Sequence, residues 1–257
     1  MLSLHVEWIS DRGGRDYNED ACGHWRSDRH LCAVLADGAG GHGGGDIASR
    51  LAVRELVGRL AQRPTERAQE LADGLRAVND AMIQARRPGT VQQDMYSTVV
   101  GLVIDLVDGR VHWGHVGDSR LYWFRRGRLL QRTRDHSMVQ SLVDAGMLKA
   151  ERISDHPQRS ELRSALGVPS DVLELAAADG EQAVQPGDVF LLCTDGLWEY
   201  TDDALLEQLL AQAGNARDWL ESLRTAVGQA TGLKAQHDNF TALTVWVDDD
   251  PAAGPAH

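Results

Sequence analysis

Hydrophobic residues in this chain follow two kinds of pattern, which predict strands in some segments and amphipathic helices in others. Short apolar or alternating runs rich in β-branched and aromatic residues predict strands, and they occupy residues 5–10, 31–36, 98–107, 110–116, 121–125, 129–133, 189–193 and 242–247. Apolar residues spaced three and four apart predict helices, which we expect after Pro64 and over residues 47–60, 137–146, 202–213 and 216–230.

The order of these elements is two strands, two helices, a run of strands, two helices and a final strand. Asp108-Gly109 and Arg126-Gly127 form turns between the middle strands, so this run is typical of an antiparallel meander. A dinucleotide-binding fold would instead alternate strand and helix throughout. The pattern therefore predicts an α+β protein in which antiparallel sheets are covered by paired helices.

Composition narrows the range of partners. The 257 residues, 42% of them hydrophobic, suffice for one sizeable core. A formal charge of −12 argues against nucleic acid, because phosphate backbones are bound by basic faces. Three isolated cysteines predict neither a disulfide framework nor a thiolate zinc site.

The ends of the chain and its longest apolar runs bear on its location. The first ten residues lack the features of a signal peptide, and no apolar run approaches the roughly 20 residues of a membrane span. We therefore expect a cytoplasmic monomer with no membrane span. Residues 249–257 are poor in large apolar side chains, which predicts a disordered tail.

A glycine-rich stretch suggests a competing function. Residues 38–43 fit the pattern G-x-G-x-x-G between a predicted strand and a predicted helix, which is the context of a dinucleotide-binding loop. Asp37 directly precedes this stretch, however, and its charge would repel a diphosphate. Because strand and helix also fail to alternate, a nucleotide-dependent oxidoreductase is the weaker interpretation.

Asp37 is one of five acidic sites with a common local design, in which an acid ends a strand-like run or adjoins a turn. The others are Asn18-Glu19-Asp20, Gly117-Asp118-Ser119, Thr194-Asp195-Gly196 and His237-Asp238-Asn239. A single acid of this kind is more often a turn former than a ligand. Two apolar strands, however, each end in Asp-Gly, at Asp37 and Asp195, and like charges gathered in one region become tolerable around a cation. Oxygen ligands without a cysteine pair favour Mg²⁺ or Mn²⁺ over Zn²⁺.

A series of short motifs runs along the chain in a fixed order. The motifs are Arg15-x-x-Asn18-Glu19-Asp20, Asp37-Gly38, Gly40-Gly41-His42, Ser97-Thr98, Gly117-Asp118-Ser119-Arg120, Asp135-His136-Ser137, His156-Pro157, Ala165-Leu166-Gly167, Asp195-Gly196 and Asp238-Asn239-x-Thr241. The series resembles the metal-dependent protein phosphatases of the type 2C (PPM) family, in the form found in bacterial stand-alone serine/threonine phosphatases. The resemblance covers about residues 6–247.

This resemblance implies a four-layer α-β-β-α sandwich, in which two antiparallel sheets are flanked by helix pairs. It assigns residues 1–248 to one phosphatase catalytic domain and places a mobile flap at about residues 147–170. It also implies a centre of two Mn²⁺ or Mg²⁺ ions at one end of the sandwich, with a weaker third ion.

The family's ligands carry over to matching positions of this chain. By the resemblance, Asp37, Asp195 and Asp238 hold the first ion, and Glu19, Asp37 and the Gly38 carbonyl hold the second. These are the residues that we take as candidate ligands.

Three further residues acquire roles in the same way. Asp118 matches the residue that holds the third ion together with Asp195 in bacterial members. Asp20 matches the acid that supports the metal-bound waters, and Arg15 matches the phosphate-binding arginine. An arginine suits that task because its planar fork can hold two phosphate oxygens.

The implied chemistry needs no protein nucleophile. Two cations roughly 3.5–4 Å apart can share a water, lower its pKa and direct it at phosphorus. The serine or threonine oxygen that leaves must gain a proton, and both His42 and a metal-bound water are candidate donors.

The sequence thus predicts a protein serine/threonine phosphatase with a signalling role, which acts on phosphoproteins, such as the substrates of a cognate serine/threonine kinase. A pseudophosphatase that binds phosphoproteins without hydrolysis is the alternative. It would lack at least one ligand, and none of the expected ligands is missing.

Overall fold

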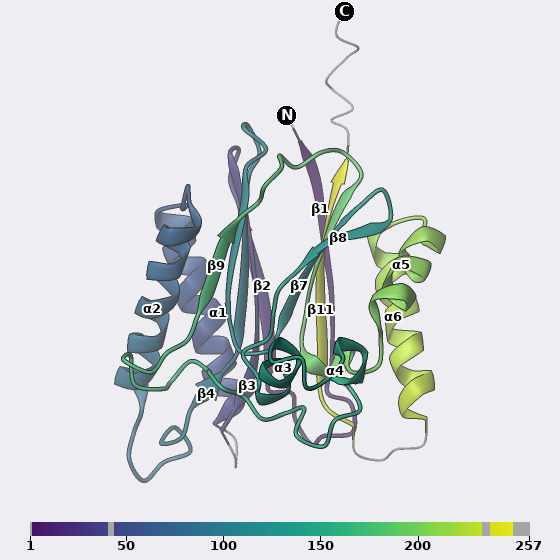
Figure 1. The fold of residues 1–257 in the computed structure, drawn as a ribbon. Helices are drawn as coiled ribbons and strands as arrows, with labels where there is room; N and C mark the ends of the chain where they lie inside the picture. Colours follow the sequence, from purple (N-terminus) through teal and green to yellow (C-terminus); the bar gives the residue numbers. More distant parts are fainter. Residues whose placement is uncertain (1, 41–43, 233–236, 249–257) are drawn as a thin grey trace, which may run out of the picture.

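Two β-sheets lie face to face in this protein, and a pair of helices covers the outer face of each (Figure 1). The structure, a computed structural model, describes residues 2–40, 44–232 and 237–248. One sheet is covered by α1 and α2 and the other by α5 and α6; these helices span Gly45–Gln62, Ala68–Ala85, Asp203–Gln212 and Ala216–Thr231. The predicted fold class, a four-layer α-β-β-α sandwich, is confirmed.

Both sheets are antiparallel throughout. The five-stranded sheet has the order β1-β11-β10-β7-β8, whose strands span Ser3–Asp11, Phe240–Asp248, Asp188–Cys193, Arg120–Arg125 and Arg128–Arg132. The six-stranded sheet has the order β2-β3-β5-β6-β9, whose strands span Asp20–Arg26, His30–Ala39, Val99–Asp105, Val111–Val116 and Ala176–Asp179, and β4 (Tyr96–Ser97) pairs with β3. The predicted turns join β5 to β6 and β7 to β8, but β6 and β7 lie in different sheets. The single meander expected from the sequence is therefore wrong, and the run forms two hairpins, one in each sheet.

The apolar side chains form three layers between the four layers of backbone. Leu35, Trp123 and Leu243 belong to the layer between the two sheets. A second layer lies beneath α5 and α6 and includes Trp219, and a third lies beneath α1 and α2 and includes Leu56. β5, β6 and β10 are buried on both faces; β5 and β10 are accordingly nearly continuous apolar runs, whereas β6 includes the buried His112 and His115. Each large apolar side chain buried in this way contributes about 1.5–3 kcal/mol.

Some short elements were not predicted from the sequence. No strand was assigned to β2, whose side chains are mostly half-buried, so its alternation of polar and apolar residues is weak. None was assigned to β9, which is Ala-Ala-Ala-Asp, because alanine is depleted in strands. α4 (Asp195–Trp198) is a single turn that follows β10 almost directly, too short to show a helical period. α3 (Met138–Asp144) lies where a helix was expected.

The predicted flap, residues 147–170, is irregular apart from the 3-10 helix η1 (Ala150–Arg152). Its second half is tied to the sandwich: Leu162 forms a bridge with Ser137, and Leu166 forms one with Ser97. Mobility of this segment stays a prediction.

Some sequence-based expectations fall elsewhere in the chain. His42, a candidate proton donor, and the predicted disordered tail 249–257 lie outside the described residues. Within the described ranges, no helix is both long enough and apolar enough to cross a membrane. The extent of the catalytic domain, residues 1–248, stays a prediction.

Candidate metal centre

Four of the predicted acidic sites converge because strand ends meet at one end of the sandwich, the lower end in Figure 1. Asp20 begins β2 and pairs in register with Asp37 near the end of β3. Asp195 follows β10, Asp238 precedes β11, and these two strands are neighbours in the other sheet. Asp37 is within hydrogen-bonding reach of Asp195, so the two sheets bring their acids together.

Polar residues beside the acids fix this convergence. The Asn239 side chain accepts a hydrogen bond from the Glu19 N–H at 2.8 Å and donates to the carbonyl of Arg12 at 2.7 Å. The Thr194 hydroxyl donates to Asp20 Oδ2 at 3.0 Å. Each tie joins segments that are more than 170 residues apart in the sequence. Neither Thr194 nor Asn239 was assigned a role from the sequence, although both adjoin predicted ligands.

The acids strongly disfavour one another's charge. Burial, followed by the charges of Asp20 and Asp195, raises the pKa of Asp37 well above its usual value. Burial raises the pKa of Asp20 to about 7, and the charge of Asp195 adds to this effect. Burial also raises the pKa of Asp195 to about 7, with further contributions from Glu199 and Asp238. When no metal ion is bound, protonation of some of these acids relieves the repulsion between their charges.

Three carboxylate oxygens at this end of the sandwich are buried without a hydrogen-bond partner in the described part of the chain: Glu19 Oε1, Asp20 Oδ1 and Asp195 Oδ1. Buried polar atoms without partners are rare and destabilising. A cation bound among them would satisfy the oxygens and offset the like charges, and the donor set suits a hard ion such as Mg²⁺ or Mn²⁺. The residues present therefore fit a metal.

Asp238 differs from the buried acids in being partly exposed and paired with a cationic side chain. Its Oδ2 accepts a hydrogen bond from Arg15 Nη2 at 2.7 Å, and both side chains are about half exposed. Consistently, no three His, Cys, Asp or Glu side chains of the described residues already form a metal cage. Arg15, the predicted phosphate-binding arginine, is thus close to the acids, with a carboxylate partner that sequence reasoning did not foresee.

Gly38 lies where three segments pass closely. Its N–H donates to the Glu19 carbonyl at 3.1 Å. A Cβ at Gly38 would overlap the Gly45 carbonyl and lie 2.8 Å from that of Glu19. The missing side chain lets α1 begin against Glu19. Burial raises the pKa of Glu19, whereas the Gly45 N–H and then the Arg15 charge act to lower it.

Asp118 lies in the turn between β6 and β7 and is 4% exposed. Its carbonyl accepts a hydrogen bond from Trp198 Nε1 at 2.9 Å, and the preceding Gly117 N–H donates to His136 Nδ1 at 3.2 Å. Burial and then the charge of Asp195 raise the pKa of Asp118 well above its usual value. The turn therefore places Asp118 in the electrostatic field of the other acids.

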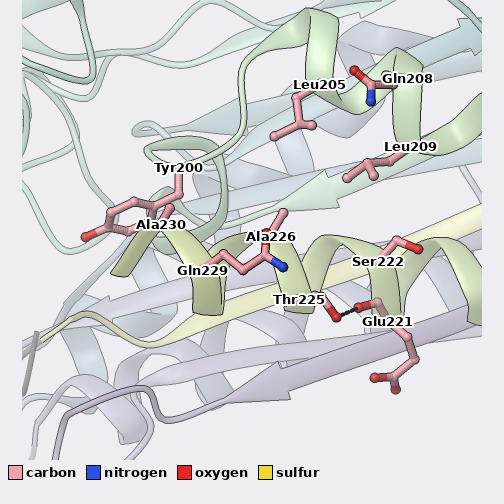
Figure 2. A pocket seen from close by; sticks show the side chains of 10 residues that line it. All are labelled: Tyr200, Leu205, Gln208, Leu209, Glu221, Ser222, Thr225, Ala226, Gln229 and Ala230. Atoms are coloured by element: carbon pink, nitrogen blue, oxygen red, sulfur yellow. Dashed lines mark hydrogen bonds between the residues drawn. The ribbon is translucent and has the colours of Figure 1, made fainter. Parts of the chain in front are cut away.

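A groove of about 730 Å³ lies elsewhere, between α5 and α6 (Figure 2). Its lining includes Leu205, Leu209 and Ala226, and its one carboxylate is Glu221. None of the predicted site residues lines it. The groove is therefore separate from the converging acids that form the candidate metal centre.

Comparisons with known proteins agree with this geometry. A family model described as Protein phosphatase 2C matches residues 11–236, and the chain belongs to this family. The serine/threonine phosphatase stp of Listeria innocua serovar 6a is 30% identical over 249 residues, which cover 94% of this chain and 95% of that protein.

Solved structures are similar over almost the whole chain. The serine/threonine phosphatase of S. agalactiae matches with a TM-score of 0.81 at 27% identity, covering 96% of this chain and 100% of the other. The catalytic domain of the phosphatase PstP, in complex with two manganese ions, matches with a TM-score of 0.79 at 29% identity, covering 97% and 100%. This chain is a bacterial protein serine/threonine phosphatase of a metal-dependent family, as the resemblance predicted.

Gly38→Ala is expected to lower the free energy of unfolding by about 1–3 kcal/mol, because the added methyl overlaps backbone that has little room to move. Gly58→Ala is the matched control: it lies within α1 with nothing within 4 Å of the added Cβ, and should stabilise by about 0.4–1 kcal/mol. Urea denaturation measures both changes. Equal stability of the two variants would contradict the close approach at Gly38.

Asp20→Asn should change how stability depends on pH in EDTA. The pKa of Asp20 is about 7 in the fold and about 4 in an unfolded chain. As pH rises from about 4 to about 7, the unfolded chain loses this proton first, so wild-type stability falls relative to the variant. The variant's advantage should therefore grow by a few kcal/mol over this window, since one pKa unit corresponds to about 1.4 kcal/mol. Urea titrations at pH 5 and pH 8 measure it, and a constant difference would show that Asp20 is ionised throughout.

Proposed function

We propose that the acids at this end of the sandwich hold two Mn²⁺ or Mg²⁺ ions, with which the protein hydrolyses phosphoserine and phosphothreonine esters. The observation that carries the proposal is the set of buried carboxylate oxygens without partners, on acids whose pKa values are raised. Such a set is destabilising alone and suits a bound cation. The similar PstP catalytic domain binds two manganese ions, which supports two ions in this protein as well.

The proposed ligands divide into two groups that share Asp37. Asp37, Asp195 and Asp238 would hold one ion, and Glu19, Asp37 and the Gly38 carbonyl would hold the other. Asp37 lies between the two groups, since it pairs across the strands with Asp20 and is within reach of Asp195. The close approach of α1 at Gly38 leaves that carbonyl at the same end of the sandwich.

The ions, when bound, lower the pKa of a water and offset the charge of the phosphoryl group. Asp20 is positioned by Thr194 through Oδ2, so its free Oδ1 can accept a hydrogen bond from the attacking water. Attack at phosphorus forms one P–O bond and breaks the ester P–O bond. The serine or threonine oxygen then takes up a proton, for which His42 and a water of the metal centre would be the candidate donors.

Arg15 would bind the phosphate. Its guanidinium is about half exposed and is held by Asp238 at 2.7 Å, so it already lies beside the acids. If Asp238 turns toward a cation, Arg15 loses this partner and gains freedom to hold two phosphate oxygens with its planar fork. The ion pair would thus keep Arg15 beside the acids until a cation binds.

The biological setting extends the same proposal. The relatives are phosphatases of proteins, so phosphoproteins are the substrates; we propose that a cognate serine/threonine kinase produces them in a signalling system. We further propose that the protein is cytoplasmic and a monomer. The cytoplasmic location is supported by the three cysteines, which lie apart in the sequence and remain unpaired in the described structure. Sedimentation of the purified protein tests the monomer.

Hydrolysis of p-nitrophenyl phosphate should require Mn²⁺ or Mg²⁺ and stop in EDTA. Asp37→Asn should lower kcat/KM by more than the roughly 10–100-fold that supporting residues of metal sites contribute. The same variant should be at least as stable as wild type in EDTA, because it relieves repulsion between like charges. Mn²⁺ should raise the Tm of wild type and leave that of the variant nearly unchanged. Full activity in EDTA would contradict the proposed metal centre.

Asp118→Asn tests the weaker third ion, which Asp118 would hold with Asp195. A site with fewer protein carboxylates keeps more water and binds loosely. The variant should retain the tight ions in calorimetry but lose the low-affinity phase of Mn²⁺ activation, with kcat falling more than KM rises. Asp171→Asn, an exposed acid without an ion pair among the described residues, is the matched control. If both variants behave as wild type, Asp118 is a structural turn residue.

A further inference from the structure

A second cavity, of about 560 Å³, adjoins the candidate metal centre. We call it the flap pocket. It is lined by Arg120, Arg132, Ala150, Glu151, Ile153, Ser154 and residues 198–205, which come from β7, β8, the flap, the end of α4 and the start of α5. Its volume lies within the range of about 300–1,000 Å³ found for small-ligand pockets.

The flap pocket shares a wall with the metal centre. That wall is α4, whose first residue is Asp195 and whose last, Trp198, donates to the Asp118 carbonyl at 2.9 Å. The next residue, Glu199, raises the pKa of Asp195 by its charge. An extended peptide advances about 3.3–3.6 Å per residue. A substrate with its phosphoresidue at the acids would therefore bring a residue a few positions away to this pocket.

The cationic side chains of the pocket are already paired. Arg120 makes two hydrogen bonds to Asp135, at 2.9 and 2.7 Å, and its guanidinium stacks 3.7 Å from the Trp198 ring centroid. Arg132 forms an ion pair with Asp203 at 2.8 Å. Neither arginine has a charge left over for an anionic ligand, so the pocket is poorly suited to a second phosphate.

Two carboxylates of the pocket are not paired in this way. Glu151 on η1 and Asp202 before α5 form no ion pair within the described residues, and both are exposed. Asp202 Oδ1 accepts the Leu205 N–H at 2.8 Å, which caps α5 and leaves its charge uncompensated. The accessible apolar lining of the pocket is at Ala150, Ala204 and Leu205, since Ile153 and Trp198 also line it but are only 3% and 4% exposed. Apolar walls with acids at the rim match a side chain that has an aliphatic stem and a cationic head.

We propose that the flap pocket binds a lysine or arginine side chain of the phosphoprotein substrate, a few residues from the phosphoserine or phosphothreonine. The stem would pack on the apolar lining at Ala150, Ala204 and Leu205, and the cationic head would lie near Glu151 and Asp202. This inference rests on the proposed metal centre, which fixes where the phosphate lies. The formal charge of −12 also favours approach of basic segments.

The test is a peptide scan with the full-length Mn²⁺-loaded enzyme. Phosphothreonine peptides carry Lys, Ala or Glu at each of the four positions on either side, and kcat/KM is measured for each. We expect one position, or two adjacent ones, to prefer Lys several-fold over Ala. Glu151→Gln and Asp202→Asn should each reduce that preference by about 2- to 5-fold, the range expected of exposed ion pairs. Asparagine retains the cap of α5, so the second variant changes charge alone.

Controls separate this inference from the proposed function. Glu181→Gln makes the same change at an exposed acid beyond β9, away from the pocket, and should leave the preference intact. Turnover of p-nitrophenyl phosphate, too small to reach the pocket, should stay unchanged in all three variants. Glu151→Arg should shift the preference from Lys toward Glu.

Two outcomes would overturn the inference: no position that prefers Lys, or a preference that survives in the Glu151→Gln/Asp202→Asn double variant. Either result can occur while p-nitrophenyl phosphate is still hydrolysed, and then only the flap pocket assignment fails. Loss of metal-dependent turnover in the wild-type enzyme would instead remove the proposed metal centre and this inference with it.

Discussion

The repulsion between buried carboxylates at one end of the sandwich is the constraint on which the rest of this structure depends. The strand register sets Asp20 opposite Asp37, and the packing of the two sheets brings Asp195 within reach of them. The backbone of Asp20 and Asp37 is held in a strand pair, and Asp195 begins α4 directly after the buried strand β10 and Thr194. The negative charge of these acids must therefore be neutralised in place, by a proton or by a cation. The raised pKa values of Asp20 and Asp195 show that protons are held there when no cation is bound.

Hydrogen bonds to the backbone oppose this repulsion. The Asp37 carbonyl accepts from the Thr98 N–H and from the Ser97 hydroxyl, both at 2.8 Å, and the Asp37 N–H donates to Thr98 Oγ1 at 3.0 Å. Asn239 holds the Glu19 segment in the same manner. These bonds act on the main chain, and one carboxylate oxygen each of Glu19, Asp20 and Asp195 has no hydrogen-bond partner among the described residues. A site built in this way is arranged before its ligand binds, which lowers the cost of ordering it.

The parts that the sequence could predict are those with a strong local signal. β10 was recognised because burial on both faces produces an apolar run, and Asp195 because it ends that run. β2 was missed, since half-buried side chains carry almost no period, although it supplies Asp20. The roles of Thr194 and Asn239 depend on contacts across the whole fold. The Arg15–Asp238 pair is likewise a long-range contact between two exposed loops, and no local pattern encodes it.

The single helical turn α4 and the residue after it contact three parts of the site: the acids, the Asp118 turn and the predicted flap. Asp195 at its start belongs to the acids, and Trp198 at its end holds the turn that carries Asp118. Glu199 follows directly and pairs with Arg159 of the flap at 2.6 Å. A shift of this turn would move the proposed ligand Asp195, the Asp118 turn and the contact to the predicted flap together. The same turn forms a wall of the flap pocket. A substrate residue bound there could therefore affect the position of Asp195, which is only three residues from Trp198 in the sequence, and with it the reaction rate.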